Sequence, residues 1–253
     1  QLLADCGFRR IEATSFVSSK WMPQMADAAE VMAGVPRRKG LSYAVLTPNL
    51  LGYHAARAAK TDEVAIFASA SEGFSRANLN ASIAESLERF RPVAEAARAD
   101  GIPMRGYVSV VTDCPFDGPT APRAVAHVVA DLLALGCHEI SLGETLGYAH
   151  PEAVRAMFDA VLTVAPAQVL AGHFHDTGGH ALQNIDVALE AGIRVFDAAV
   201  GGLGGCPYAP GAPGNVATEI VARHLATSGF ESGLDMAKLG KAADFARSLR
   251  SAA

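Results

Sequence analysis

The sequence predicts an α/β protein, a (β/α)₈ TIM barrel that here lacks its first strand and most of its first helix. Three observations lead to this prediction. Short apolar segments alternate with amphipathic ones along the chain, which is typical of a parallel sheet covered by helices. Seven such apolar segments follow an opening stretch, QLLADCG, that resembles the last turns of a helix ending at Gly7. One strand before that stretch would complete the eight units of a closed barrel.

The expected elements follow one another in a regular order. The strands are RRIEATSF (9–16), LSYAVLTP (41–48), EVAIFASAS (63–71), MRGYVSVV (104–111), EISLGETLG (139–147), VLAGHFHD (169–176) and IRVFDAAVGG (193–202). Helices are expected over 82–101, 121–136, 150–166, 181–192 and 215–229, with one more at 235–252. Residues 1–253 are therefore expected to form one barrel domain, with strands 2–8 and an extra C-terminal helix at 235–252; the resemblance described below makes it the catalytic domain. An open doubly wound sheet is the alternative, but no GxGxxG turn follows a first strand.

Composition excludes several classes of protein. Half of the residues are hydrophobic and 19% are charged, which is typical of a globular chain. A net charge of −5 argues against a general nucleic-acid binder, and no apolar run is long enough to span a membrane. The four cysteines show no CxxC spacing, so we expect reduced thiols and a cytoplasmic protein. The mitochondrial matrix stays open, because the sequence has no initiator Met.

Two histidines, His173 and His175, flank Phe174 at the end of an apolar run. Side chains alternate along a strand, so both imidazoles should point to one face. A divalent metal would satisfy both together, and two separately hydrogen-bonded histidines are the alternative. Ligand softness alone favours Zn²⁺ or Mn²⁺ over Mg²⁺.

Other polar residues fall near the ends of the expected strands, where barrel enzymes place their chemistry. Glu12 should share a face with Thr14, unless it pairs with a neighbouring arginine. Arg105 needs an anion, supplied either by protein or by substrate. Glu144 is either a site carboxylate or a residue that caps a helix or lies at the rim. Asp176 either orients a histidine or caps the following helix. Ser15 and Ser141 occupy similar positions.

The segment GGLGGCPYAPGAPGN (201–215) is too rich in glycine and proline for a helix or strand. At a barrel mouth such a loop is a candidate lid. It carries Cys206, whose thiol is suited to proton transfer near neutral pH. It ends at Asn215, which either caps the next helix or ligates a metal, or does both.

Six stretches together carry a resemblance to a known family. They are IEATSFVSSKWMPQMAD, LTPNLLGYHAA, RGYVSVVTDCPFDG, EISLGETLG, GHFHDTGGHALQN and GGLGGCPYAPGAPGN. Along essentially its whole length the chain resembles the 3-hydroxy-3-methylglutaryl-CoA lyases, a group within the DRE-TIM metallolyases. The resemblance implies a (β/α)₈ barrel that cleaves its acyl-CoA substrate to acetoacetate and acetyl-CoA. It also implies Mg²⁺ or Mn²⁺. We expect a homo-oligomer, a dimer, and from the charge and hydropathy neither nucleic-acid nor membrane partners.

The resemblance assigns roles to individual residues. It implies metal ligation by His173, His175 and Asn215, and catalytic roles for Cys206, Glu12 and Glu144. Arg105, Ser15 and Ser141 would line the substrate pocket. Two departures stand out: the family usually has Asp where this chain has Glu144, and its Arg-Asp-Gly-Leu-Gln motif on the first strand is absent. That motif supplies a metal-binding Asp and a catalytic Arg, so we expect the 253-residue chain alone to be inactive and marginally folded.

Two alternatives are weighed against the lyase. Related condensing enzymes, such as isopropylmalate and homocitrate synthases, share the HxH pattern but carry a Glu-Arg pair where this chain has Cys206-Pro207. A non-catalytic barrel is the second alternative. The Cys206 loop favours the lyase over the condensing enzymes.

Overall fold

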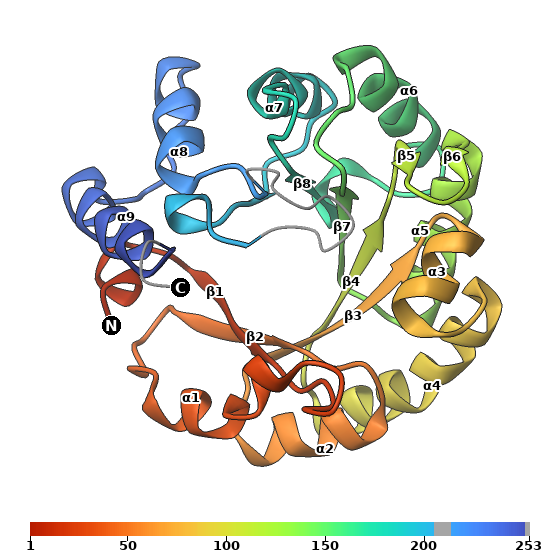
Figure 1. Ribbon diagram of the computed structural model, residues 1–253, viewed down its shortest axis with the longest axis horizontal. Helices are drawn as coiled ribbons and strands as arrows, with labels where there is room; N and C mark the ends of the chain where they lie inside the picture. Colours follow the sequence, from red (N-terminus) through yellow and green to blue (C-terminus); the bar gives the residue numbers. More distant parts are fainter. Residues whose placement is uncertain (205–213, 251–253) are drawn as a thin grey trace.

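The protein is described by a computed structural model that covers residues 1–204 and 214–250. Within them, seven parallel strands form one sheet in the order β1-β2-β3-β4-β7-β8-β9. The sheet curls around a centre, with helices on its outside (Figure 1). The strands are β1 (Arg10–Ser15), β2 (Ser42–Leu46), β3 (Glu63–Ser69), β4 (Met104–Ser109), β7 (Glu139–Glu144), β8 (Leu170–Phe174) and β9 (Phe196–Asp197). Because the strands of this sheet follow the chain without any reversal of order, the barrel prediction is confirmed over the doubly wound alternative.

Helices connect successive strands and begin and end at recognisable residues. The α-helices are α1 (Ala28–Gly34), α2 (Leu50–Ala58), α3 (Glu72–Leu79), α4 (Ile83–Asp100), α5 (Pro122–Leu135), α6 (Pro151–Val161), α7 (Ala181–Glu190), α8 (Thr218–Thr227) and α9 (Met236–Arg250). Short 3₁₀ turns lie at η1 (Leu3–Asp5), η2 (Pro23–Met25), η3 (Ala167–Val169) and η4 (Val200–Gly202). A capping box of Ser82 and Glu85 starts α4, and left-handed Gly101 ends it. No helix of the described residues is long and apolar enough to cross a lipid bilayer.

The hydrophobic core lies between the outer face of the sheet and the helices. Alternate strand residues such as Val64, Ile66, Ile140 and Leu142 are fully buried there, together with Leu132 of α5. The intervening strand residues point into the ring, and many of them are polar. This division gives the barrel an apolar outer layer and a polar interior, which positions the candidate site.

Some local structure differs from the expectation. The opening stretch forms a 3₁₀ turn, η1, rather than the end of an α-helix, although Gly7 has the expected positive φ of 97°. A small antiparallel pair, β5 (Asp113–Cys114) and β6 (Gly118–Pro119), follows β4 and was not foreseen. Two-residue strands leave too little hydrophobic alternation to be recognised.

The sheet has two open edges. β1 and β9 stand at the ends of the strand order and do not pair with each other. The expected gap between them is present, and a compensating cluster lies beside it. Cys6 packs there with Ala222 of α8 and Leu239 of α9, and the Asp235 amide donates to the Cys6 carbonyl at 2.8 Å. In Figure 1, α9 lies against the N-terminal segment at this side of the barrel.

Candidate active site and metal centre

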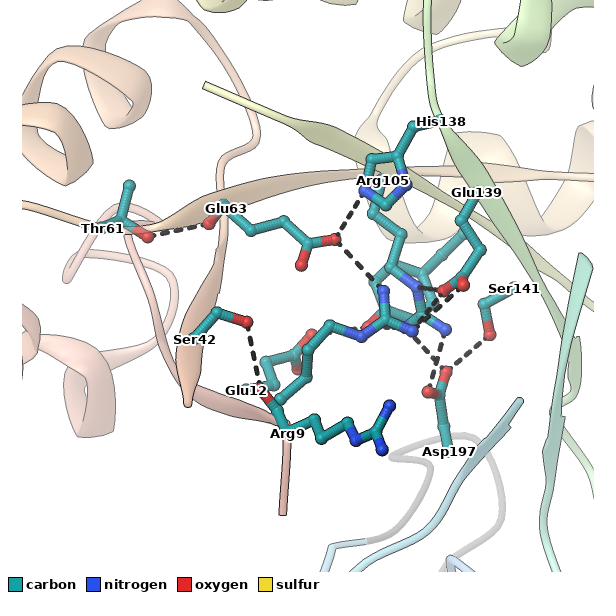
Figure 2. A network of polar contacts seen from close by, with 12 residues as sticks. Arg9, Glu12, Ser42, Thr61, Glu63, Arg105, His138, Glu139, Ser141 and Asp197 are labelled. Atoms are coloured by element: carbon teal, nitrogen blue, oxygen red, sulfur yellow. Dashed lines mark hydrogen bonds and ion pairs between the residues drawn. The ribbon is translucent and has the colours of Figure 1, made fainter. Parts of the chain in front are cut away.

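A buried guanidinium organises the polar interior of the barrel. Arg105 of β4 is 5% exposed. Its Nε donates to Glu139 Oε1 at 2.7 Å, and its two terminal nitrogens donate to the two carboxylate oxygens of Asp197 at 2.9 Å each. Figure 2 shows these side chains pointing toward one another from different strands. Burial opposes the charge of Arg105, but Asp197 holds its pKa above the ordinary value. The Arg105 guanidinium and the Asp197 carboxylate are therefore charged.

The same network is extended by Tyr107 to Glu12. Arg105 donates to the Tyr107 hydroxyl at 2.6 Å, and that hydroxyl donates to Glu12 Oε2 at 2.7 Å. Burial, and next the Glu12 charge, raise the pKa of Tyr107 well above its ordinary value, so the phenol keeps its proton. The protein atoms around the carboxylate raise the pKa of Glu12, although the hydrogen bond from Tyr107 opposes this. Glu12 thus contacts Tyr107, while Arg10 pairs with Glu139 and Glu63.

The prediction that Glu12 and Thr14 share a face of the strand is wrong. A β-bulge lies between Glu12 and Thr14, because Glu12 pairs with Ala44 and Thr14 with the next residue, Val45. The extra residue moves Thr14 to the outer face and brings Ser15 onto the face of Glu12. The Ser15 hydroxyl is buried at the end of β1, with no hydrogen bond to the described residues.

The two histidines of β8 converge as expected from their spacing. Their ring centroids lie 5.5 Å apart, with 38° between the ring planes. His175 is 8% exposed, and burial, aided by the neighbouring His173, lowers its pKa to about 4. At neutral pH His175 is therefore an uncharged imidazole, the form that ligates metals. His173 Nδ1 lies 3.5 Å from Asp197 Oδ2, longer than an ordinary hydrogen bond.

Asn215 lies beside this pair. Its backbone forms an isolated bridge with His175, and its side-chain nitrogen donates to the Leu203 carbonyl at 3.1 Å. That bond orients the amide and leaves its oxygen as the acceptor end. Asn215 does not cap α8, whose N-cap is Ala217.

The donor set suits one divalent cation. Two imidazoles and an amide oxygen are groups that ligate divalent metals, and the imidazole of His175 is uncharged at neutral pH. Among those residues, no group of three or more His, Cys, Asp or Glu side chains could hold a metal. His173, His175 and Asn215 therefore fit as part of a coordination shell, with further ligands still required.

A cavity of about 820 Å³ opens between β1 and β9. Its polar lining includes Glu12, Arg105, Tyr107, His173, Asp197 and Asn215, and its apolar lining comes largely from η1, β9 and α9. The cavity joins the candidate site to the open edges of the sheet. Substrate-sized space is thus present beside His173 and Glu12.

Other predicted residues lie elsewhere. Glu144 pairs in register with Phe174, on the outer face of the sheet, away from Ser141. Its Oε1 accepts from the Gly147 amide at 3.0 Å, while Oε2 is buried without a hydrogen bond to described residues. Burial raises the pKa of Glu144 to about 7. The structure therefore places Glu144 at the end of β7, with its side chain bonded to the turn that follows rather than among the inward-facing side chains.

The remaining candidates lie in different places. Ser141 points inward and donates to Asp197 Oδ2 at 2.6 Å. Asp176 accepts from the Ala181 amide at 3.1 Å, which supports the capping alternative at the start of α7. Cys206 lies outside the described residues. The described contacts of the Arg105 guanidinium go to protein groups, so the protein, rather than substrate, supplies the anion that it requires.

Asp197 and Tyr107 were not singled out from the sequence. A lone Asp in the apolar segment IRVFDAAV was the available signal, because a buried carboxylate needs a cation and Arg105 needs an anion. Sequence spacing could not pair them, since the two residues are 92 positions apart.

Comparison with known proteins places this site in a family. Residues 1–246 match the family model described as HMGL-like. The chain is 54% identical to the mitochondrial hydroxymethylglutaryl-CoA lyase of Arabidopsis thaliana, covering 97% of this chain but 52%, about half, of that protein. It is 52% identical to the cytoplasmic 3-hydroxy-3-methylglutaryl-CoA lyase of Danio rerio, covering 96% of this chain and 73% of that protein.

A solved structure agrees with these sequence matches. The crystal structure of the HMG-CoA lyase from Brucella melitensis superposes with a TM-score of 0.97 at 61% identity. The match covers 99% of this chain and 88% of that one. With the barrel, the histidine pair and the family match in agreement, the chain belongs to the HMGL-like family.

Proposed function

We propose that this chain provides the catalytic domain of a metal-dependent hydroxymethylglutaryl-CoA lyase, which cleaves 3-hydroxy-3-methylglutaryl-CoA to acetoacetate and acetyl-CoA. The observation that carries the proposal is the convergence of His173, His175 and Asn215 inside the barrel. The matched relatives named as this lyase support the substrate. The Cys206-Pro207 pair argues against the condensing enzymes.

The proposed metal is Mg²⁺, held by His173, His175 and the Asn215 oxygen together with ligands from beyond these residues. When bound, it would lower the free energy needed to deprotonate the tertiary hydroxyl of the substrate and fix its orientation. The resemblance supports Mg²⁺ or Mn²⁺, whereas two imidazoles alone would favour a softer ion. The uncharged state of His175 supports ligation near neutral pH.

The reaction needs one proton removed and one returned. The hydroxyl loses a proton, the bond between its carbon and the CH₂ next to the thioester breaks, and its electrons form the thioester enolate. Protonation of that enolate gives acetyl-CoA. Glu12 is the described carboxylate placed for proton transfer, because it lines the cavity and has a raised pKa. We assign the returning proton to Cys206, which lies in the sequence between Leu203 and Asn215, both cavity-lining residues.

Ser15, Ser141 and Glu144 also have proposed roles. Ser15 is on the inward face of β1 and its hydroxyl is free to bond a substrate oxygen. Ser141 is engaged by Asp197, so we assign it to holding that carboxylate rather than to substrate. Glu144 would act on the site through the turn after β7. A homodimer in the cytoplasm completes the proposal, and the relatives compared above are mitochondrial or cytoplasmic by name.

The test is a product assay on two proteins, the 253-residue chain and the same chain extended by a strand carrying the Arg-Asp-Gly-Leu-Gln motif. With Mg²⁺, the extended protein should release acetoacetate and acetyl-CoA in equal amounts at a rate of about 10 s⁻¹, an ordinary enzymatic turnover. The unextended chain should be far slower, because β1 and β9 leave the sheet open. No products from the extended protein would refute the proposed function.

A further inference from the structure

We propose that Asp197 is a positioning residue. Its carboxylate accepts a hydrogen bond from the Nδ1–H group of His173, so that Nε2 of that ring faces the metal. The inference rests on the proposed function, because it concerns the same metal site. It assigns a role to a carboxylate that local sequence patterns do not mark as a site residue.

The first observation is adjacency. β8 and β9 are parallel neighbours, and His173 and Asp197 are register partners across them. Residues in register share a face of the sheet, so both side chains point into the barrel. Asp197 Oδ2 lies 3.5 Å from the buried Nδ1 of His173, an atom with no hydrogen bond to the described residues. A small movement of either side chain makes the bond.

The second observation is that Asp197 is held firmly. Arg105 clamps both of its oxygens at 2.9 Å, and the Ser141 hydroxyl donates to Oδ2 at 2.6 Å. Bidentate guanidinium–carboxylate pairs fix orientation as well as charge. Side chains from β4 and β7 thus fix the orientation of a carboxylate on β9. The arrangement suits a group whose position controls a neighbour.

The third observation is chemical. A neutral imidazole carries its proton on one nitrogen and can ligate only through the other. Metal-ligating histidines commonly donate the second ring N–H to a carboxylate or carbonyl, and loss of that partner costs about 10–100-fold in metal affinity. Asp197 is placed to fill this role for His173. Tyr107, whose ring meets the His173 ring edge-on with centroids 6.4 Å apart, packs against the same imidazole.

The test compares Asp197→Asn with a matched control, Glu139→Gln. Both substitutions remove one carboxylate from Arg105, but only Asp197 also reaches His173. The protons on the histidine rings of the 253-residue chain are located from ¹⁵N chemical shifts at pH 8, with His173 assigned by His173→Gln. Mn²⁺ binding is titrated in the same variants of the extended protein, which supplies the further ligands.

We expect His173 to carry its proton on Nδ1 in the wild type and Glu139→Gln, and on Nε2 in a substantial fraction of Asp197→Asn. Mn²⁺ affinity should fall about tenfold or more in Asp197→Asn and stay within about twofold in Glu139→Gln. The same tautomer in all three proteins, or an equal loss of affinity in both variants, would overturn the inference. If Asp197→Asn does not fold, Ser141→Ala should shift the His173 tautomer in the same direction by a smaller amount. An unchanged tautomer in Ser141→Ala would also overturn the inference.

Failure of the proposed function gives a different result. An extended wild-type protein that binds no Mn²⁺ would remove the metal from the proposal, whereas the ring tautomers would still decide whether Asp197 orients His173.

Discussion

Replacing Glu144 by Gln should change how the stability of the protein depends on pH. Glu144 is fully buried at the end of β7, and only one of its oxygens accepts hydrogen bonds, from Gly147 and Thr112. Burial raises its pKa from 4.5 to about 7. The folded state therefore favours the protonated acid, which Gln resembles in shape and charge.

The sign and size of the effect follow from linkage between protonation and folding. Below pH 4.5 both the folded and unfolded states hold the proton, so the shift has no effect on stability. Between pH 4.5 and 7 the unfolded state loses the proton while the folded state keeps it, so stability falls as pH rises. A shift of about 2.5 units at 1.36 kcal/mol per unit gives a loss of about 3 kcal/mol by pH 8.

Urea unfolding of wild type and Glu144→Gln at pH 4.5, 6 and 8 measures this difference. Relative to wild type, the variant should gain about 3 kcal/mol of unfolding free energy between pH 4.5 and 8, because it has no proton to lose. Glu88→Gln is the control, since Glu88 is an exposed carboxylate whose pKa is lowered by Arg91. Its removal should give a small trend of opposite sign. A difference between Glu144→Gln and wild type that does not vary with pH would refute the burial argument.

Three further predictions concern the core, the polar network and Cys206. Leu142→Ala removes a fully buried side chain and should lower the unfolding free energy by roughly 2–5 kcal/mol. The control, Leu249→Ala, changes a half-exposed side chain and should have little effect. Equal losses of unfolding free energy in urea titrations of the two variants would contradict the assignment of Leu142 to the core. Arg105→Met leaves Asp197 and Glu139 without their shared cation and should lower the unfolding free energy by roughly 3–5 kcal/mol. An unchanged unfolding free energy would mean that the polar network does not stabilise the fold. Cys206→Ser in the extended protein should lower kcat about 100-fold with Mg²⁺ binding intact, and a normal kcat would exclude Cys206 from proton transfer.

Much of the barrel could be predicted from the sequence because parallel strands buried by helices are apolar and short. The segment 139–147 shows this well. Its first six residues form β7, and their side chains alternate between the apolar core outside the sheet and the polar interior of the barrel. The capping box at Ser82 likewise identifies the start of α4 from local chemistry alone. These signals depend only on neighbouring residues, so no tertiary information is needed.

The failures have equally specific causes. A β-bulge after Glu12 reverses the face of Thr14, and strict alternation cannot foresee an inserted residue. Asp197 gains its importance from Arg105 and His173, which reach it across strand pairings that the sequence does not encode locally. Register turns the side chain of Glu144 away from the inward-facing residues of its motif, while its catalytic role stays a prediction. Contacts between distant strands, rather than local patterns, decide these positions.

The dependence of lyase activity on Mg²⁺ in the extended protein tests the proposed metal-dependent lyase most directly. Acetoacetate release from 3-hydroxy-3-methylglutaryl-CoA is measured across a Mg²⁺ titration for wild type and His175→Ala, with Glu139→Gln as the control. Loss of one ligand should raise the half-saturating Mg²⁺ concentration of His175→Ala about tenfold or more, equivalent to about 1.4 kcal/mol of binding free energy, while the control remains near wild type. Equal half-saturating concentrations in wild type and His175→Ala, or full activity in the presence of a chelator, would contradict a metal-dependent lyase site at these histidines.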